Sequence, residues 1–212
     1  SHNIWWLDEL GNPVFVMSKQ TSVARQAPRA RRLRAPADGV LSSLHWVPFD
    51  TPALSPCDVR VRVRAAGLNF RDVLAALGTY PGTPHALGAE CVGVVTDAGE
   101  TSGYSRGDRV LAFGPATLAT EVTLPAHAVV PAPDSPDDDI LAGLPVVFLT
   151  AWVALHHIAK LQPNETVLIH AAAGGVGMAA VQVAKHLRTL HAKALPQVKV
   201  IKLNVDDDAN DS

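Results

Sequence analysis

The sequence has few cysteines: Cys57 and Cys91 are the only two among 212 residues. Two thiols cannot form a framework of several disulfides, and they cannot supply the ligands of a four-cysteine zinc lobe. We therefore expect buried thiols of a cytosolic protein and take a cytoplasmic location as the default interpretation.

Other features are also scarce. Aromatic residues make up 5% of the chain, so the core must rest on Val, Leu and Ala. Eighteen basic and 20 acidic residues leave a formal net charge of −2, which argues against a general binder of nucleic acid or membrane surfaces. No apolar run approaches the about 20 residues that span a bilayer. The first ten residues lack the basic flank and apolar run of a signal peptide.

Residues 1–37 have the composition of an N-terminal extension or linker. The apolar run at residues 4–6, the turn residues 8–13 and the apolar run at 14–17 predict a hairpin. The arginine-rich stretch 25–34 has two interpretations. One is a basic patch that binds a cofactor phosphate or an acidic carrier protein. The other, which we favour, is a solvated linker strand.

Residues 38–135 predict a mostly β domain. From Asp58 to Arg64, Val and Arg alternate, which is typical of a strand with one buried and one solvated face. Further short apolar runs are separated by turns rich in Gly and Pro, which together indicate a small, partly open barrel. One helix is expected from Phe70 to Leu77, because Gly78 is a typical C-terminal stop.

Residues 136–190 have an α/β pattern. The carboxylates at 137–139 favour the start of a helix, and residues 149–161 predict a second helical stretch. Residues 166–170 form an apolar run typical of a buried parallel strand. The fold class expected is therefore α/β, with a mostly β domain and a partial Rossmann-type segment.

A glycine-rich turn follows this strand and precedes a helix. In the dinucleotide fingerprint G-x-G-x-x-G, Ala172 takes the first position, Gly174 the second and Gly177 the third, with Gly175 and Val176 between them. Gly174 would let the backbone approach a pyrophosphate, and Gly177 would let the helix pack on the strand. The helix N-terminus would offer N–H groups to phosphate. This context predicts a dinucleotide site, with a tight structural turn as the alternative.

Five sequence blocks occur in order and carry a family resemblance. They are Gly67 to Val73, Tyr80 to Gly82, Gly107 to Val110, Val146 to Ala151 and His170 to Ala180. Together they resemble the medium-chain dehydrogenase/reductase superfamily, specifically the enoyl reductases of polyketide and fatty-acid synthases, over about residues 38–187. The resemblance implies a GroES-like substrate domain before the Rossmann-type segment. Relatives with zinc carry Cys within the block filled here by residues 69–72, and Gly-His-Glu where this chain has residues 88–90, so no metal site is implied.

The resemblance also implies a reaction: NADPH-dependent reduction of an α,β-unsaturated thioester on an acyl carrier protein, beside neighbouring megasynthase domains. It places Asn69 beside nicotinamide and substrate, and Thr150 close to the cofactor. It matches Tyr80 to a tyrosine implicated in proton delivery or in setting the stereochemistry at the α-carbon, because a phenol is an acid that can hydrogen-bond an enolate. The alternatives are a rim aromatic for Tyr80 and a helix-packing threonine for Thr150.

After Leu187 the family pattern stops, and the segment 191–212 has two interpretations. Residues 198–205 could be a second Rossmann strand, with Asp206 as a ribose ligand that favours NAD, although the spacing is too long. The favoured interpretation is a closing strand that returns to the substrate domain, which leaves the nucleotide-binding segment truncated.

Truncation raises an alternative function, a non-catalytic scaffold or docking domain. The apolar surface that the missing part of the nucleotide-binding segment would leave exposed favours self-association into a homodimer. A free-standing zinc-free quinone oxidoreductase is a third and less favoured hypothesis.

Overall fold

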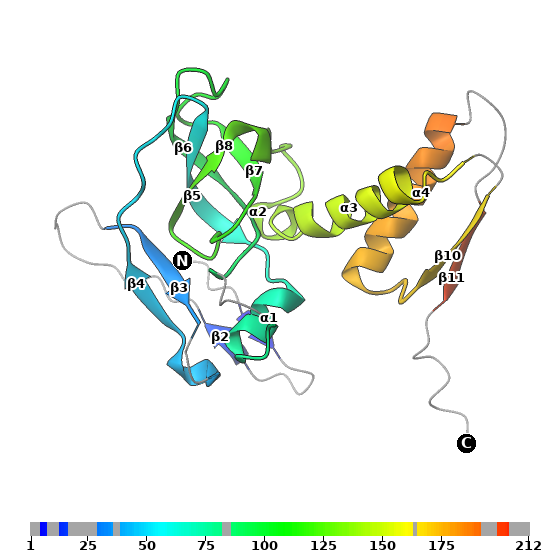
Figure 1. Ribbon diagram of the computed structural model, residues 1–212, viewed down its shortest axis with the longest axis horizontal. Coiled ribbons are helices and arrows are strands. Elements are labelled where there is room, and N and C mark those ends of the chain that lie inside the picture. Colours follow the sequence, from blue (N-terminus) through cyan, green and yellow to red (C-terminus); the bar gives the residue numbers. More distant parts are fainter. Residues whose placement is uncertain are drawn as a thin grey trace.

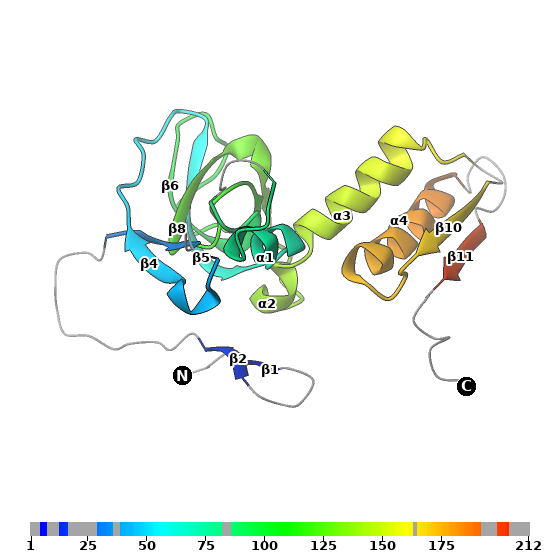
Figure 2. The same ribbon diagram turned by 60° about the horizontal axis from the view of Figure 1, so that its bottom comes forward.

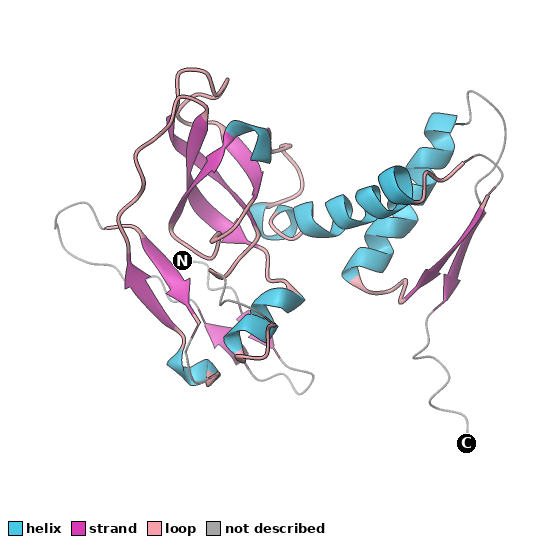
Figure 3. Cartoon of the chain, in the orientation of Figure 1, coloured by secondary structure: helices cyan, strands magenta, loops and turns pink. Residues whose placement is uncertain are grey.

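The structure is a computed structural model. It describes residues 5–7, 13–16, 29–35, 39–81, 86–162, 165–191 and 199–203. Figure 1 and Figure 3 show a β-rich group of elements and an α/β group, joined by one helix. This arrangement agrees with a mostly β substrate domain followed by a Rossmann-type segment.

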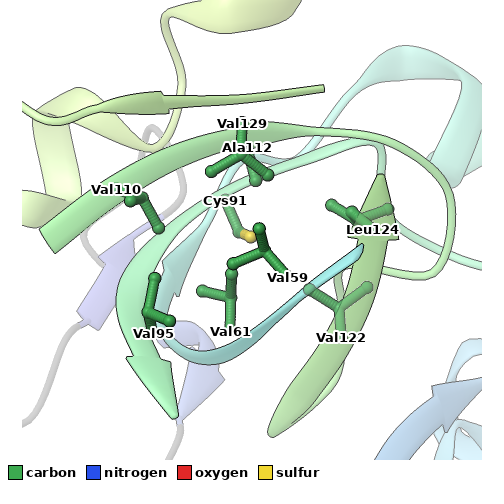
Figure 4. Close-up of a cluster of buried hydrophobic side chains, with 9 residues drawn as sticks. All are labelled: Val59, Val61, Cys91, Val95, Val110, Ala112, Val122, Leu124 and Val129. Carbon is green, nitrogen blue, oxygen red and sulfur yellow. The ribbon is translucent and has the colours of Figure 1, made fainter. Parts of the chain in front are cut away.

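The β-rich group is built on a five-stranded antiparallel sheet with the strand order β8-β5-β6-β7-β9. Its strands are β5 (Asp58–Ala66), β6 (Glu90–Ala98), β7 (Arg109–Phe113), β8 (Glu121–Pro125) and β9 (Val129–Pro131). The alternation expected in β5 is confirmed, because Val59 and Val61 are fully buried whereas Arg62 is exposed. These two valines belong to a cluster of nine buried side chains, among them Cys91, that fills the curled sheet (Figure 4).

Two short hairpin-like pairs lie outside this sheet. Strands β1 (Trp5–Leu7) and β2 (Pro13–Val16) pair antiparallel, which confirms the expected N-terminal hairpin. Strands β3 (Arg31–Arg34) and β4 (His45–Pro48) also pair antiparallel, with the 3-10 turn η1 (Leu41–Ser43) before β4. Strand β3 is hydrogen-bonded to the segment before β8, so this part of the supposed extension is attached to the substrate domain.

Helices α1 and α2 begin where the sequence predicts, whereas α3 does not. Helix α1 (Phe70–Ala76) is followed by Gly78 with a φ of 68°, as the glycine stop requires. Helix α2 (Asp138–Leu141) carries the expected carboxylates in its first turn, and η2 (Ala126–Ala128) is a 3-10 turn. Helix α3 (Pro145–Trp152) starts earlier than predicted, because proline is favourable at the first helical position. It continues as the π-helical turn η3 (Val153–Ile158).

The α/β group contains the parallel strands β10 (Thr166–His170) and β11 (Lys199–Leu203), connected through α4 (Gly175–His191). The favoured expectation for the closing segment is therefore wrong: β11 pairs with β10, not with the substrate domain. An alternating strand fits any free edge of suitable register, so its own pattern does not identify its partner. The pairing agrees with the alternative, a second Rossmann strand, while Asp206 lies outside the described residues.

Helix α3 links the two groups. In Figure 1 and in the turned view of Figure 2 it runs from the β-rich group to α4. Its buried Ala151 packs in one cluster with Leu155 and with Ala184 and Leu187 of α4. Among the helices of the described part of the chain, none is long and apolar enough to cross a membrane.

Asp138 fastens α2 to the sheet. Its Oδ1 accepts hydrogen bonds from Arg109 Nε at 2.8 Å and Nη2 at 2.6 Å, and its Oδ2 lies 2.7 Å from Arg64 Nε. Arg109 also donates to the carbonyl oxygen of Pro133, in the segment between β9 and α2. One carboxylate therefore fixes the segment that leads from the substrate domain towards α3.

We expect Asp138→Asn to lower the free energy of unfolding by about 1–3 kcal/mol, because two charge-assisted contacts lose their anion. Asp139→Asn is the matched control: it removes an exposed carboxylate from the same helical turn and should change little. Urea unfolding followed by circular dichroism measures both. Equal losses in the two variants would contradict the role of Asp138.

The two cysteines should react differently. Burial raises the pKa of the Cys91 thiol to about 12, and the charge of Glu90 adds to the rise. The stabilising contribution of the neutral thiol is therefore present at neutral pH and lost as the pH rises towards that value. At about pH 8 a thiol reagent should modify exposed Cys57 in the folded protein, and Cys91 only after unfolding. Native mass spectrometry that finds Cys91 modified, or Cys57→Ser still reactive, would refute this.

Candidate active site

A cavity of about 350 Å³ lies where the sheet meets the first turns of α3. This volume falls within the range of about 300–1,000 Å³ that small-molecule sites occupy. The cavity is lined by Asn69, Arg71, Ala89, Phe113, Gly114, Pro115, Val146 and Thr150. Its walls are thus mainly apolar, with a few polar groups from α1 and α3.

Two residues predicted to belong to the site meet at this cavity. Asn69 precedes α1 and occupies its N-cap position, and Thr150 lies on α3. The Thr150 hydroxyl donates to the carbonyl oxygen of Val146 at 2.7 Å. This bond to its own helix agrees with the helix-packing alternative, although the residue also forms part of the cavity wall.

The buried residue Glu90 holds this wall together. It is 1% exposed, and its Oε1 accepts a hydrogen bond from Asn69 Nδ2 at 2.9 Å. Its Oε2 accepts a hydrogen bond from the Val146 backbone N–H at 2.7 Å. Burial raises the pKa of the Glu90 carboxyl; the two hydrogen bonds oppose the rise, and the charge of Asp72 adds to it. Sequence reasoning missed this role, since residues 88–90 were considered only for the ligand that they lack.

Asp72 fixes the backbone around Asn69. Its buried carboxylate accepts from the Asn69 backbone N–H at 3.0 Å and from the Gly88 N–H at 2.9 Å. Gly88 has a φ of 90°, and a Cβ there would lie 2.3 Å from the Leu118 nitrogen. The Asp72 carboxylate therefore joins the start of α1 to the tight turn that leads into β6.

Arg71 lines the cavity and was also missed by sequence reasoning. Its Nη2 lies 3.4 Å from the Gly88 carbonyl oxygen and 3.9 Å from Asp72 Oδ1. The sequence did contain a signal for it. Arg71 lies in the same sequence block as Asn69, so a cationic side chain stands close to a residue that was assigned to substrate binding. The guanidinium gives the cavity its only cationic lining group among the described residues.

Tyr80 lies in the segment that follows α1. It is half-buried, and its backbone N–H donates to the Leu74 carbonyl oxygen at 3.1 Å. It is not one of the residues that line the cavity. Gly82, in the same sequence block, lies outside the described residues. The role of Tyr80 therefore stays a prediction.

The glycine turn between β10 and α4 is tightly packed at Gly177 and more open at Gly174. A Cβ on Gly177 would lie 2.1 Å from the Ala171 carbonyl oxygen, so only glycine allows α4 to pack this closely on the turn. A Cβ on Gly174 would meet nothing nearer than this oxygen, at 3.4 Å. Ala172 is buried, whereas Val176 is exposed at the start of α4. The first N–H groups of α4 lack partners within the helix, which suits a phosphate.

The turn and the cavity are connected through α3. A Cβ on Gly175 would lie 3.3 Å from Cγ1 of Val147, the neighbour of the lining residue Val146. One helix thus contacts the predicted phosphate site and forms part of the cavity wall. Within the part of the chain that the structure describes, no group of three or more His, Cys, Asp or Glu residues is placed to hold a metal ion.

Comparison with known proteins identifies relatives of both parts. The alcohol dehydrogenase GroES-like domain family matches residues 55–134. A phenolphthiocerol/phthiocerol polyketide synthase of Mycobacterium tuberculosis is 53% identical over 131 residues, covering 60% of this chain and 6% of that protein.

Solved structures extend the similarity into the α/β group. The crystal structure of CurK enoyl reductase has a TM-score of 0.71 and 35% identity, covering 84% of this chain and 54% of that one. A mycobacterial protein complexed with NADPH has a TM-score of 0.64 and 27% identity, covering 84% of this chain and 60% of that one. The chain thus spans about half the length of the solved relatives and a small part of the polyketide synthase.

The two outer glycines of the turn should respond differently to a methyl group. Gly177→Ala should lower the free energy of unfolding by about 1–3 kcal/mol, because backbone atoms must move. Gly174→Ala should keep the fold and weaken NADPH binding, because its Cβ lies where a phosphate would approach. Urea unfolding and titration of NADPH fluorescence separate the two effects. A Gly174→Ala variant that binds NADPH as tightly as the unmodified chain would show that the turn is only structural.

Proposed function

This chain belongs to the enoyl reductases of polyketide synthases, in the medium-chain dehydrogenase/reductase superfamily, and we propose that it takes part in NADPH-dependent reduction of an α,β-unsaturated acyl thioester. The observation that carries the proposal is the position of α3, which contributes Val146 and Thr150 to the cavity and contacts the glycine turn through Val147. A reductase needs its substrate and its dinucleotide at one place, and α3 links the two sites.

The dinucleotide phosphates bind at the glycine turn in this proposal. Gly174 leaves room for them, and the N–H groups of Gly175, Val176 and Gly177 face them from the start of α4. Ala172 is buried beneath the turn. NADPH is proposed over NADH, with support from a similar mycobacterial protein that is complexed with NADPH. When bound, the reduced nicotinamide supplies hydride to the β-carbon of the substrate.

The cavity residues bind and orient the acyl thioester. The apolar wall of Ala89, Phe113 and Pro115 suits a hydrocarbon chain and excludes water from it. The Arg71 guanidinium and the second N–H of the Asn69 amide, whose first N–H donates to Glu90 Oε1, offer donors to the thioester oxygen as negative charge develops there. Asn69 therefore has a catalytic role, and Thr150 lies beside the cofactor.

Tyr80 supplies the proton in this proposal. Hydride addition breaks the carbon–carbon double bond and leaves an enolate, whose α-carbon then takes a proton to give the saturated thioester. The phenol of Tyr80 is the donor, which requires its ring to approach the cavity once substrate is bound. Apo distances do not exclude such a donor, because catalytic contacts often tighten only in the complex.

The partners proposed are an acyl carrier protein, which presents the thioester on its phosphopantetheine arm, and neighbouring megasynthase domains. They are supported by similarity to a polyketide synthase, of which the chain covers only a small part. A homodimer and a cytoplasmic location stay predictions.

The first experiment titrates NADPH into the purified chain, with NADH for comparison, and then measures reduction of a short enoyl pantetheine thioester. We expect saturable NADPH binding. Tyr80→Phe should slow reduction by about 100-fold or more without weakening NADPH binding.

Tyr104→Phe is the matched control, because the chain has two tyrosines and the Tyr104 hydroxyl donates to the Val129 carbonyl oxygen at 2.6 Å, among residues that do not line the cavity. It should retain the rate. Equal rates for Tyr80→Phe and the unmodified chain would remove Tyr80 from the mechanism. A folded chain that does not bind NADPH would instead favour the non-catalytic scaffold or docking domain.

A further inference from the structure

We propose that Glu90 is a positioning residue, which holds the Asn69 side-chain amide in one orientation and fixes it relative to the first turn of α3. This inference rests on the proposed function, since it assigns Glu90 a role through Asn69. Glu90 lies on β6 with 1% of its surface exposed, so it does not itself reach bulk solvent.

Each carboxylate oxygen of Glu90 has a different partner. Oε1 accepts from Asn69 Nδ2 at 2.9 Å, and Oε2 accepts from the Val146 N–H at 2.7 Å. An ionised carboxylate only accepts hydrogen bonds, so the amide must present its nitrogen to Glu90. The amide oxygen then lies on the opposite side. Because Asp72 also binds the backbone N–H of Asn69, both the backbone and the amide of this residue are held.

The second oxygen fixes the helix. Val146 is in the first turn of α3, where backbone N–H groups have no partner in the helix and favour a negative charge. Val146 lines the cavity, and the next residue, Val147, lies against the glycine turn at Gly175. A single carboxylate therefore sets the distance between the Asn69 amide and the helix that contacts the predicted cofactor site.

The Gly67 backbone lies close to the Glu90 carboxylate. A Cβ on Gly67 would lie 2.3 Å from Glu90 Oε1 and 2.6 Å from the Ala142 carbonyl oxygen. The backbone at Gly67 thus packs directly against the carboxylate. A glutamine at position 90 has the same shape but only one acceptor oxygen, so its NH₂ group must face either the Val146 N–H or the Asn69 NH₂ group.

The test substitutes Glu90→Gln in the full chain and measures kcat for the enoyl thioester together with the Kd for NADPH. We expect kcat to fall about 10–100-fold, because a small misplacement of a reacting group costs this much, while the Kd for NADPH changes little. Glu121→Gln is the matched control: this half-buried glutamate pairs with Arg60 at 3.8 Å and does not line the cavity. It should leave kcat unchanged. An unchanged kcat in Glu90→Gln would overturn the proposal.

A second measurement does not depend on activity. Asn69→Asp places two carboxylates against each other and should lower Tm, whereas Asn69→Asp combined with Glu90→Gln restores a donor between them and should recover it. The side-chain amide signal of Asn69 in a nitrogen–proton NMR spectrum, assigned by its loss in Asn69→Asp, should also shift in Glu90→Gln.

The two proposals fail in distinguishable ways. If the unmodified chain neither binds NADPH nor reduces the thioester, the proposed function fails, while the Tm comparison and the amide signal still test the contact between Glu90 and Asn69. Equal Tm values for Asn69→Asp and the double variant, or an Asn69 amide signal that does not move in Glu90→Gln, would overturn the positioning role.

Discussion

The buried carboxylate of Glu90 is the contact on which the arrangement of the two parts depends. The β-rich group has its own core inside the curled sheet, and α3 and α4 share another. A smaller apolar cluster around Val92, Leu141 and Ala142 packs α2 on the sheet. A carboxylate buried at such a junction is tolerated because both of its oxygens are hydrogen-bonded, and removing either donor would leave one oxygen without that partner. Apolar packing alone would allow many relative positions of the parts, whereas these bonds select one.

Close approach of backbone segments is the second constraint. At Gly67 the chain packs against the Glu90 carboxylate, and at Gly177 the start of α4 packs against the Ala171 carbonyl oxygen. Neither position has room for a side chain; one lies beside Glu90 and the other at the glycine turn. The Asp138 carboxylate, held by Arg64 and Arg109, fixes α2 to the sheet. The site is therefore shaped by backbone and ionic contacts at its edges, and its apolar walls fill the space that these leave.

The sequence predicted the features that depend on local pattern. Alternation in β5 follows from a period of two, and the glycine turn follows from its place between a strand and a helix. Glu90 could not be found in this way, because its donors lie 21 and 56 residues away in the chain. Strand β11 was assigned to the wrong partner for a related reason: its own residues do not specify which edge it joins. Roles that arise from contacts between distant segments require the fold.

Helix α3 lies beside both the cavity and the glycine turn. Its first turn is held by Glu90, its next residues border the cavity and the glycine turn, and its last residues pack on α4. After Trp152 it widens into a π-helical turn, in which His156 stacks on Trp152 with ring centroids 4.5 Å apart. The wider turn changes which side chains face α4 without interrupting the helix. Because α3 is held at one end by a carboxylate and at the other by apolar packing, the spacing of Asn69 from the glycine turn depends on the whole helix.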